Sequence, residues 1–183
     1  QKEKGPMKVL HVGCGGSTLP DIFPELEEIR LDLDPASGAN MIGSMLDIPL
    51  DDGRVDVVYT SHTLEHVTQH DGVRALKEFL RVLRKGGQCI CIVPNIGALA
   101  ERIASGDLYT ELYNSPGGPV CAADMLYGHQ GLIERDRQHK AYRFQHKFGY
   151  TPETLAKTFE SVGFRAVKSQ KINVWDVACT GLK

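Results

Sequence analysis

Two sets of residues in this chain have types and spacings that could do chemistry. The first is a glycine cluster that ends a short apolar run, residues 9–16, and it is followed nineteen positions after Gly13 by Asp32. Glycines have no Cβ, so they let a backbone approach a ligand closely, and an acid about twenty residues later is placed to hold a ribose. This pattern predicts a nucleotide-binding loop with an acidic ribose anchor.

The second set is a run of histidines around a glutamate, His62-Thr63-Leu64-Glu65-His66, with His70 four positions later. The run satisfies the H-x-x-E-H pattern of a class of zinc proteases, and on a helix its histidines would share one face. Short motifs match by chance, and this one follows an expected strand of a nucleotide-binding sheet. We therefore expect no metal here, and a zinc hydrolase that uses His62, Glu65 and His66 is the least favoured alternative.

Alternating strand and helix patterns must position both sets. Apolar and β-branched runs predict strands at residues 8–12, 29–33, 55–60, 88–93, 165–172 and 174–182. Helical spacing of apolar residues predicts helices over 71–83 and 96–104, and a third that begins at Thr151. Between the first two strands, Pro20 and Pro24 leave room for only a short or broken helix. This order predicts a parallel sheet closed by two antiparallel strands.

Residues 97–150 interrupt the alternation. After a turn-rich stretch at 115–119 they carry many aromatic and basic side chains, namely Tyr127, His129, Arg135, Arg137, His139, Tyr142, Arg143, Phe144 and His146. A long connection is usually functional or disordered, and aromatic residues argue against disorder. We therefore expect residues 1–183 to form a single domain in which about 97–150 is an inserted cover over the ligand edge of the sheet.

Composition excludes several classes of protein. The chain has 183 residues, 42% of them hydrophobic, which suits one sizeable core. A net charge of −2 gives no excess of positive charge with which to bind nucleic acid or an anionic membrane. No apolar run approaches the roughly 20 residues of a membrane span. Five cysteines without paired spacing favour a reducing compartment, so we expect a cytoplasmic protein.

The third glycine of a dinucleotide fingerprint is missing from the loop, where Thr18 stands in its place. Further motifs follow the loop at residues 9–16, namely residues 31–35, 43–50 with 56–62, and 80–87, together with the run from His62 to Val67. In this order and spacing they resemble the motifs of the class I S-adenosylmethionine-dependent methyltransferases, in particular their small type 11 branch. The resemblance implies an α/β Rossmann-like three-layer sandwich, with a mostly parallel seven-stranded sheet and an antiparallel last strand. It also implies S-adenosyl-L-methionine as the cofactor and S-adenosyl-L-homocysteine as its product.

The resemblance also implies a set of cofactor-binding residues. Gly13, Cys14 and Gly15 would contact the methionine part, and Asp32 would accept both ribose hydroxyls, with Asp34 as the rival acid. Ser44 stands where the family often has an adenine-binding aspartate, so Ser44 or Asp47 would replace it, and Met45 would pack on the purine. The remaining expected cofactor-binding residues are Leu33, Leu46, Ser61 and His62.

The implied reaction is methyl transfer to an acceptor, for which we expect a small molecule. An imidazole titrates near neutral pH, so His62 is the first candidate for a general base, with His129 and His146 in reserve. An NAD-dependent oxidoreductase and a non-catalytic cofactor-binding protein are the alternatives on the same fold. Members of the family carry helices before the first strand, whereas this chain begins almost on it, so we expect either the insertion or the second subunit of a homodimer to close the pocket.

Overall fold

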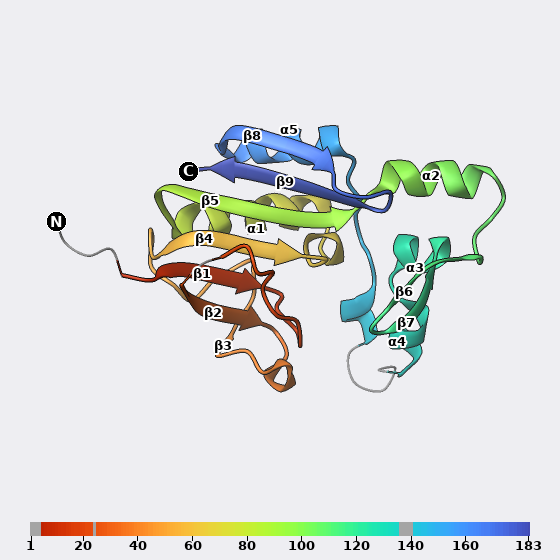
Figure 1. Ribbon diagram of the computed structural model, residues 1–183, viewed down its shortest axis with the longest axis horizontal. Coiled ribbons are helices and arrows are strands. Elements are labelled where there is room, and N and C mark those ends of the chain that lie inside the picture. Colours follow the sequence, from red (N-terminus) through yellow and green to blue (C-terminus); the bar gives the residue numbers. More distant parts are fainter. Residues whose placement is uncertain (1–4, 24, 136–140) are drawn as a thin grey trace.

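The computed structural model describes residues 5–23, 25–135 and 141–183 (Figure 1). Its strands are β1 (Met7–Val12), β2 (Leu26–Asp32), β3 (Met41–Ile42), β4 (Val55–Ser61), β5 (Leu83–Pro94), β6 (Glu111–Ser115), β7 (Gly118–Cys121), β8 (Arg165–Lys171) and β9 (Asp176–Leu182). Its α-helices are α1 (Gln69–Val82), α2 (Ile96–Ala104), α3 (Ala122–Tyr127), α4 (Gln130–Arg135) and α5 (Pro152–Val162). Short 3₁₀ turns are η1 (Pro35–Ser37), η2 (Leu64–His66) and η3 (Ala141–Phe144).

One seven-stranded sheet organises the molecule, in the order β3-β2-β1-β4-β5-β9-β8. The pairs from β3 to β5 are parallel, and β9 is antiparallel to both of its neighbours. The expected mostly parallel seven-stranded sheet with an antiparallel last strand is therefore confirmed. Strand β3 was not predicted as an element, because a two-residue strand has no periodicity to detect.

Helices α1 and α5 cover one face of the sheet and enclose the main core (Figure 1). Thr68 caps α1 by accepting the amide of Asp71, and the helix ends at Val82 because the next residue starts β5. Strand β5 begins at Leu83, earlier than the expected strand at 88–93, so Gly86 and Gly87 lie within it. Helix α5 begins as predicted, with Thr151 as its N-cap and Gly163 as a left-handed C-cap.

The opposite face of the sheet carries no helix in the described part of the chain (Figure 1). The third layer of the fold is therefore a loop on this face. Leu19 and Phe23 of the loop pack on a cluster of buried strand residues, Val9, Val57 and Tyr59. Glycines and prolines between β1 and β2 account for this, since both residue types disfavour a helix interior.

The expected insertion folds around a second, smaller core beyond the carboxyl ends of the parallel strands (Figure 1). Helices α2 and α3 pack on each other, and β6 pairs with β7 as an antiparallel hairpin. Leu99, Val120, Ala122 and Met125 form the buried centre of this cluster. The chain then returns to the main sheet, where the amide of Ile96 donates to the carbonyl of Tyr150.

Arg81 on α1 ties the loop that follows β3 to the helical layer. Its guanidinium donates to the carbonyls of Ile48 and Leu50, at 2.9 and 2.6 Å, and is held by Glu78 at 2.7 Å. Glu78 also accepts the amide of Ile48 at 2.8 Å. The guanidinium of Arg81 therefore lowers the pKa of the Glu78 carboxyl, and the backbone hydrogen bond adds to the effect.

Replacing Glu78 by glutamine should lower the free energy of unfolding by an amount that depends on pH, because it removes the ion pair with Arg81. A carboxyl whose pKa is lowered by folding stabilises the protein above its unfolded pKa, and the stabilisation is lost as the pH falls through the folded value. Because the pair is partly exposed, we expect E78Q to cost about 1–2 kcal/mol at about pH 7.5 and less below about pH 4. Urea unfolding across this range measures the difference. The exposed Glu101→Gln is the control, and an equal loss at both pH values would contradict the assignment.

Among the residues that the structure describes, no helix is both long and apolar enough to cross a bilayer.

Candidate functional site

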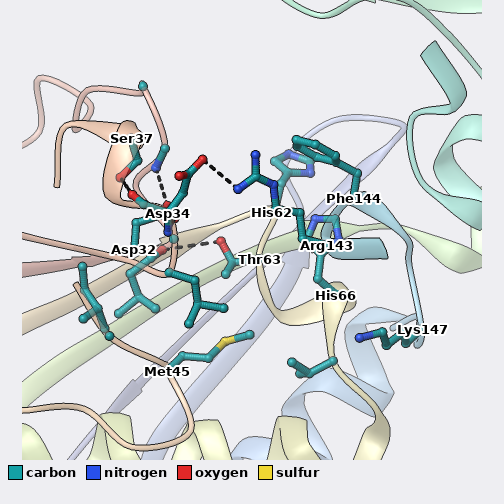
Figure 2. A pocket seen from close by; sticks show the side chains of 18 residues that line it. Asp32, Asp34, Ser37, Met45, His62, Thr63, His66, Arg143, Phe144 and Lys147 are labelled. Carbon is teal, nitrogen blue, oxygen red and sulfur yellow. Dashed lines mark hydrogen bonds and ion pairs between the residues drawn. The ribbon is translucent and has the colours of Figure 1, made fainter. Parts of the chain in front are cut away.

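A cavity of about 440 Å³ opens where the parallel strands end, between the glycine loop and the returning segment of the insertion (Figure 2). Such a position is where open α/β sheets bind ligands. Its size falls within the range of roughly 300–1,000 Å³ that is typical of small-molecule sites. The residues that line it are Val12, Gly13, Gly15, Gly16, Leu31, Asp32, Leu33, Asp34, Ser37, Gly43, Met45, His62, Thr63, His66, Val67, Arg143, Phe144 and Lys147.

The glycine loop has the backbone shape and the clearance that a close ligand contact needs. Gly13 has a φ of +66°, and a Cβ there would lie 2.3 Å from Thr63 Oγ1. Gly15 has a φ of +47°, and nothing lies within 4 Å of the place a Cβ would occupy. Arg30 holds the loop from below by donating to the carbonyl of Gly15 at 2.9 Å. Both glycines are therefore required by conformation, and Gly15 leaves open space above the loop.

Asp32 joins the loop to the end of β2. Its two carboxylate oxygens accept the amides of Gly15 and Asp34, each at 2.8 Å. A carboxylate has about four acceptor positions, so each oxygen keeps capacity for a further donor. Asp34, the rival acid, caps η1 and is paired with Arg143 at 2.7 Å. Of the two acids, Asp32 thus has the position that suits a pair of ribose hydroxyls.

Several of the expected cofactor residues lie beside the cavity rather than in its wall. Met45 lines it, and Leu33 does so with 65% of its surface exposed. Ser44 turns its hydroxyl to the amide of Leu46 at 3.1 Å. The cavity wall does not include Cys14, Ser44, Leu46 or Ser61, and Cys14 is buried at 1% exposure.

The insertion supplies the wall that faces the glycine loop (Figure 2). Arg143 reaches across to Asp34, and its guanidinium lies 5.1 Å from the ring centroid of Phe144. Lys147 and Thr63 also line the cavity, and sequence reasoning named neither as a site residue. The polar and aromatic composition of 127–146 pointed to this segment, but it did not distinguish which side chains face the ligand. Arg137 and His139, noted from sequence, lie outside the described residues.

His62 lies on the cavity wall in a conformation that is rare for a side-chain-bearing residue. Its φ is +52°, and its side chain is 45% exposed. Its Nδ1 lies 3.6 Å from Glu65 Oε1 and its Nε2 lies 3.5 Å from Asp176 Oδ1. Desolvation lowers the pKa of His62, but the two carboxylates outweigh it and the net pKa is raised. Residues held in such strained conformations cluster at functional sites.

Glu65 is the buried centre of a cluster of imidazoles. The side chain is 1% exposed, and His62, His66 and His146 surround it. Burial alone would raise the pKa of this carboxyl, but the three imidazoles more than compensate and lower it. Desolvation in turn lowers the pKa of His146. The zinc-protease alternative required one helix from His62 onward, whereas the structure has only the η2 turn there and His70 lies exposed on α1.

The three candidate bases are not equivalent in position. His62 lines the cavity, and His146 lies beside Glu65, with its ring centroid 4.8 Å from that of His66. His129 lies at the start of α4, where its ring accepts the amide of Leu132, and it is not part of the cavity wall. The structure therefore brings two of these histidines together and leaves the third apart.

Known proteins resemble this chain in sequence and in fold. The model of the family described as "Methyltransferase domain" matches residues 10–91. A probable S-adenosylmethionine-dependent methyltransferase of Mycolicibacterium smegmatis is 28% identical over 154 residues, covering 72% of this chain and 59% of that protein. Ajmaline N-methyltransferase of Rauvolfia serpentina is 31% identical over 109 residues, 49% of this chain and 37% of that protein. This chain thus spans less than two thirds of the length of either curated relative.

Solved structures share the fold at low identity. The 1,6-didemethyltoxoflavin-N1-methyltransferase of Burkholderia thailandensis, solved with 1,6-didemethyltoxoflavin and S-adenosylhomocysteine bound, has a TM-score of 0.61 and 16% identity, over 98% of this chain and 72% of that one. This likeness confirms the expected Rossmann-like α/β fold.

Proposed function

We propose that this chain is a class I S-adenosylmethionine-dependent methyltransferase and that it transfers a methyl group from S-adenosylmethionine to a small-molecule acceptor. The observation that carries the proposal is Asp32, whose carboxylate orders the glycine loop and keeps acceptor capacity toward the cavity. The curated relative named ajmaline N-methyltransferase, and the enzyme of similar fold solved with 1,6-didemethyltoxoflavin and S-adenosylhomocysteine, support a small-molecule acceptor.

The residues of the cavity fit the cofactor. Gly15 and Gly16 leave free space for the methionine part, since no atom lies within 4 Å of a Cβ built on either. Asp32 would accept the ribose hydroxyls, and Gly43 and Met45 would border the adenine. Arg143 and Phe144 cover the cavity from the insertion. When bound, the cofactor supplies a methyl group on a sulfonium, whose carbon–sulfur bond breaks as the acceptor bonds to carbon and the electron pair returns to sulfur.

The protein's part in this reaction is to align the acceptor and to take up its proton. His62 lies at the end of β4 in the cavity wall, where it can accept a proton from an acceptor hydroxyl or ammonium group. Asp176 and Glu65 lie against the two nitrogens of His62 and stabilise the imidazolium that then forms. We therefore assign His62 the role of general base, with His146 as the reserve candidate.

Calorimetry with three ligands and a labelling screen tests the proposal. We expect S-adenosylmethionine and S-adenosylhomocysteine to bind one per chain, and NAD to give no binding heat. With methyl-labelled S-adenosylmethionine, a panel of small hydroxyl and amine compounds should yield labelled product. Binding of NAD alone would indicate the oxidoreductase alternative. Binding of S-adenosylhomocysteine without transfer to any compound would favour a non-catalytic protein.

A further inference from the structure

The carboxylate of Glu65 is buried without a hydrogen-bond partner. Neither of its oxygens accepts a hydrogen bond from the described residues, although the side chain is only 1% exposed. His62 Nδ1 at 3.6 Å and His146 Nε2 at 4.0 Å from Oε1 lie beyond hydrogen-bond distance. Buried charges in proteins are paired or coordinate metals. Both carboxylate oxygens of Glu65 therefore keep the capacity to bind a cation at short distance.

The two histidines beside Glu65 are held in the tautomer that a metal ligand needs. His66 Nδ1 lies 3.1 Å from the carbonyl of Gln145, and His146 Nδ1 lies 2.7 Å from the carbonyl of Met125. A carbonyl oxygen only accepts, so each Nδ1 carries a proton, and in the neutral ring each Nε2 then keeps its lone pair. Such a hydrogen bond from Nδ1 to a backbone carbonyl is how metal-binding histidines are oriented.

The three side chains are close enough to share one ion. A carboxylate oxygen of Glu65 and one nitrogen each of His66 and His146 all lie within 4.8 Å of one another. Two ligands of a tetrahedral zinc ion lie about 3.3 Å apart, so shifts of about 1 Å would complete the site. His66 also lines the cavity, whereas Glu65 is enclosed, so the cluster is open on the ligand side.

We propose that Glu65, His66 and His146 bind a divalent transition-metal ion at the edge of the cofactor cavity. Two imidazoles and one carboxylate suit zinc, iron(II), cobalt or nickel, whereas magnesium and calcium prefer oxygen ligands only. Three protein ligands with an open position are typical of catalytic rather than structural metal sites. This proposal departs from the expectation of no metal at this run. It differs from the zinc-protease pattern, because the third ligand is His146 from the insertion instead of His62.

The ion would hold an oxygen of the acceptor next to the methyl donor. A metal-bound hydroxyl loses its proton more easily, which would favour its attack on the methyl carbon. This role rests on the proposed methyl transfer, whereas metal binding itself does not.

Metal stoichiometry on the untagged, chelator-treated chain tests the site. We expect calorimetry with zinc sulfate, and elemental analysis after dialysis, to show one zinc per chain, while magnesium chloride gives no binding. Glu65→Gln keeps the shape of the side chain and His146→Ala removes one ligand, so each should weaken zinc binding at least 100-fold. His70→Ala, an exposed histidine on α1, is the matched control and should bind zinc like the unaltered chain.

A second measurement on the unaltered chain covers the case in which a variant fails to fold. Histidine ¹⁵N spectra should show zinc on Nε2 of two rings whose Nδ1 stays protonated. No stoichiometric zinc, or zinc binding that survives both E65Q and H146A or is lost equally in H70A, would overturn the site. S-adenosylhomocysteine titrations of the unaltered chain, with and without zinc, separate this failure from that of the proposed function, because we expect the cofactor to bind in both cases.

Discussion

Asp32→Ala is expected to weaken the binding of S-adenosylhomocysteine by about 10²–10⁴-fold. Two hydrogen bonds from ribose hydroxyls to a carboxylate contribute about 1.5–3 kcal/mol each, and about 1.4 kcal/mol corresponds to a factor of ten. The same carboxylate also accepts the amides of Gly15 and Asp34, at 2.8 Å each. Alanine would therefore remove the ribose anchor and leave the loop amide of Gly15 without its partner.

Calorimetry on matched variants separates these two effects. Asp32→Asn keeps one acceptor oxygen, so we expect an intermediate loss of affinity and little loss of stability. Asp51→Ala removes an exposed carboxylate outside the cavity and should leave the dissociation constant unchanged. If D32A bound S-adenosylhomocysteine as tightly as the unaltered chain, the ribose assignment would be wrong, and Asp34 would be the acid to examine.

Much of the main sheet could be predicted because its strands are continuous apolar runs bounded by turns. The run Val55 to Thr60 is buried on both faces of the sheet, and such strands carry a strong local signal. The end of α1 was predicted to within one residue, but the start of β5 could not be placed, because it depends on the pairing of Leu83 with Val55, and that contact is not local. Gly86 and Gly87 therefore lie within β5.

In the candidate site, too, residues in local motifs could be predicted, whereas contacts between distant segments could not. The glycine loop and Asp32 are read from one short stretch, because close approach and left-handed φ require glycine itself. His62 and His66 are near Glu65 in the sequence, but His146 comes from the insertion, and Gln145, which orients His66, is 79 positions away. No periodicity or spacing encodes such a contact, so His146 could be named as a reserve base but could not be placed beside Glu65.

His62→Asn should lower kcat by about 10²-fold or more while leaving the fold and the cofactor affinity intact. A positioned general base contributes about 10²–10⁴-fold, and the amide of asparagine cannot accept a proton at neutral pH. Asparagine tolerates a positive φ, so the backbone at +52° should be preserved.

The measurement is the rate of methyl transfer to an acceptor from the labelling screen, with S-adenosylhomocysteine affinity and melting temperature recorded for each variant. His70→Asn on the exposed side of α1 is the control, and we expect its kcat to match that of the unaltered chain. A structural role for His62 would lower the melting temperature or the cofactor affinity together with kcat. An unchanged kcat in H62N would remove His62 as the base. His146 would then be the next residue to test, because it is the other candidate histidine beside Glu65.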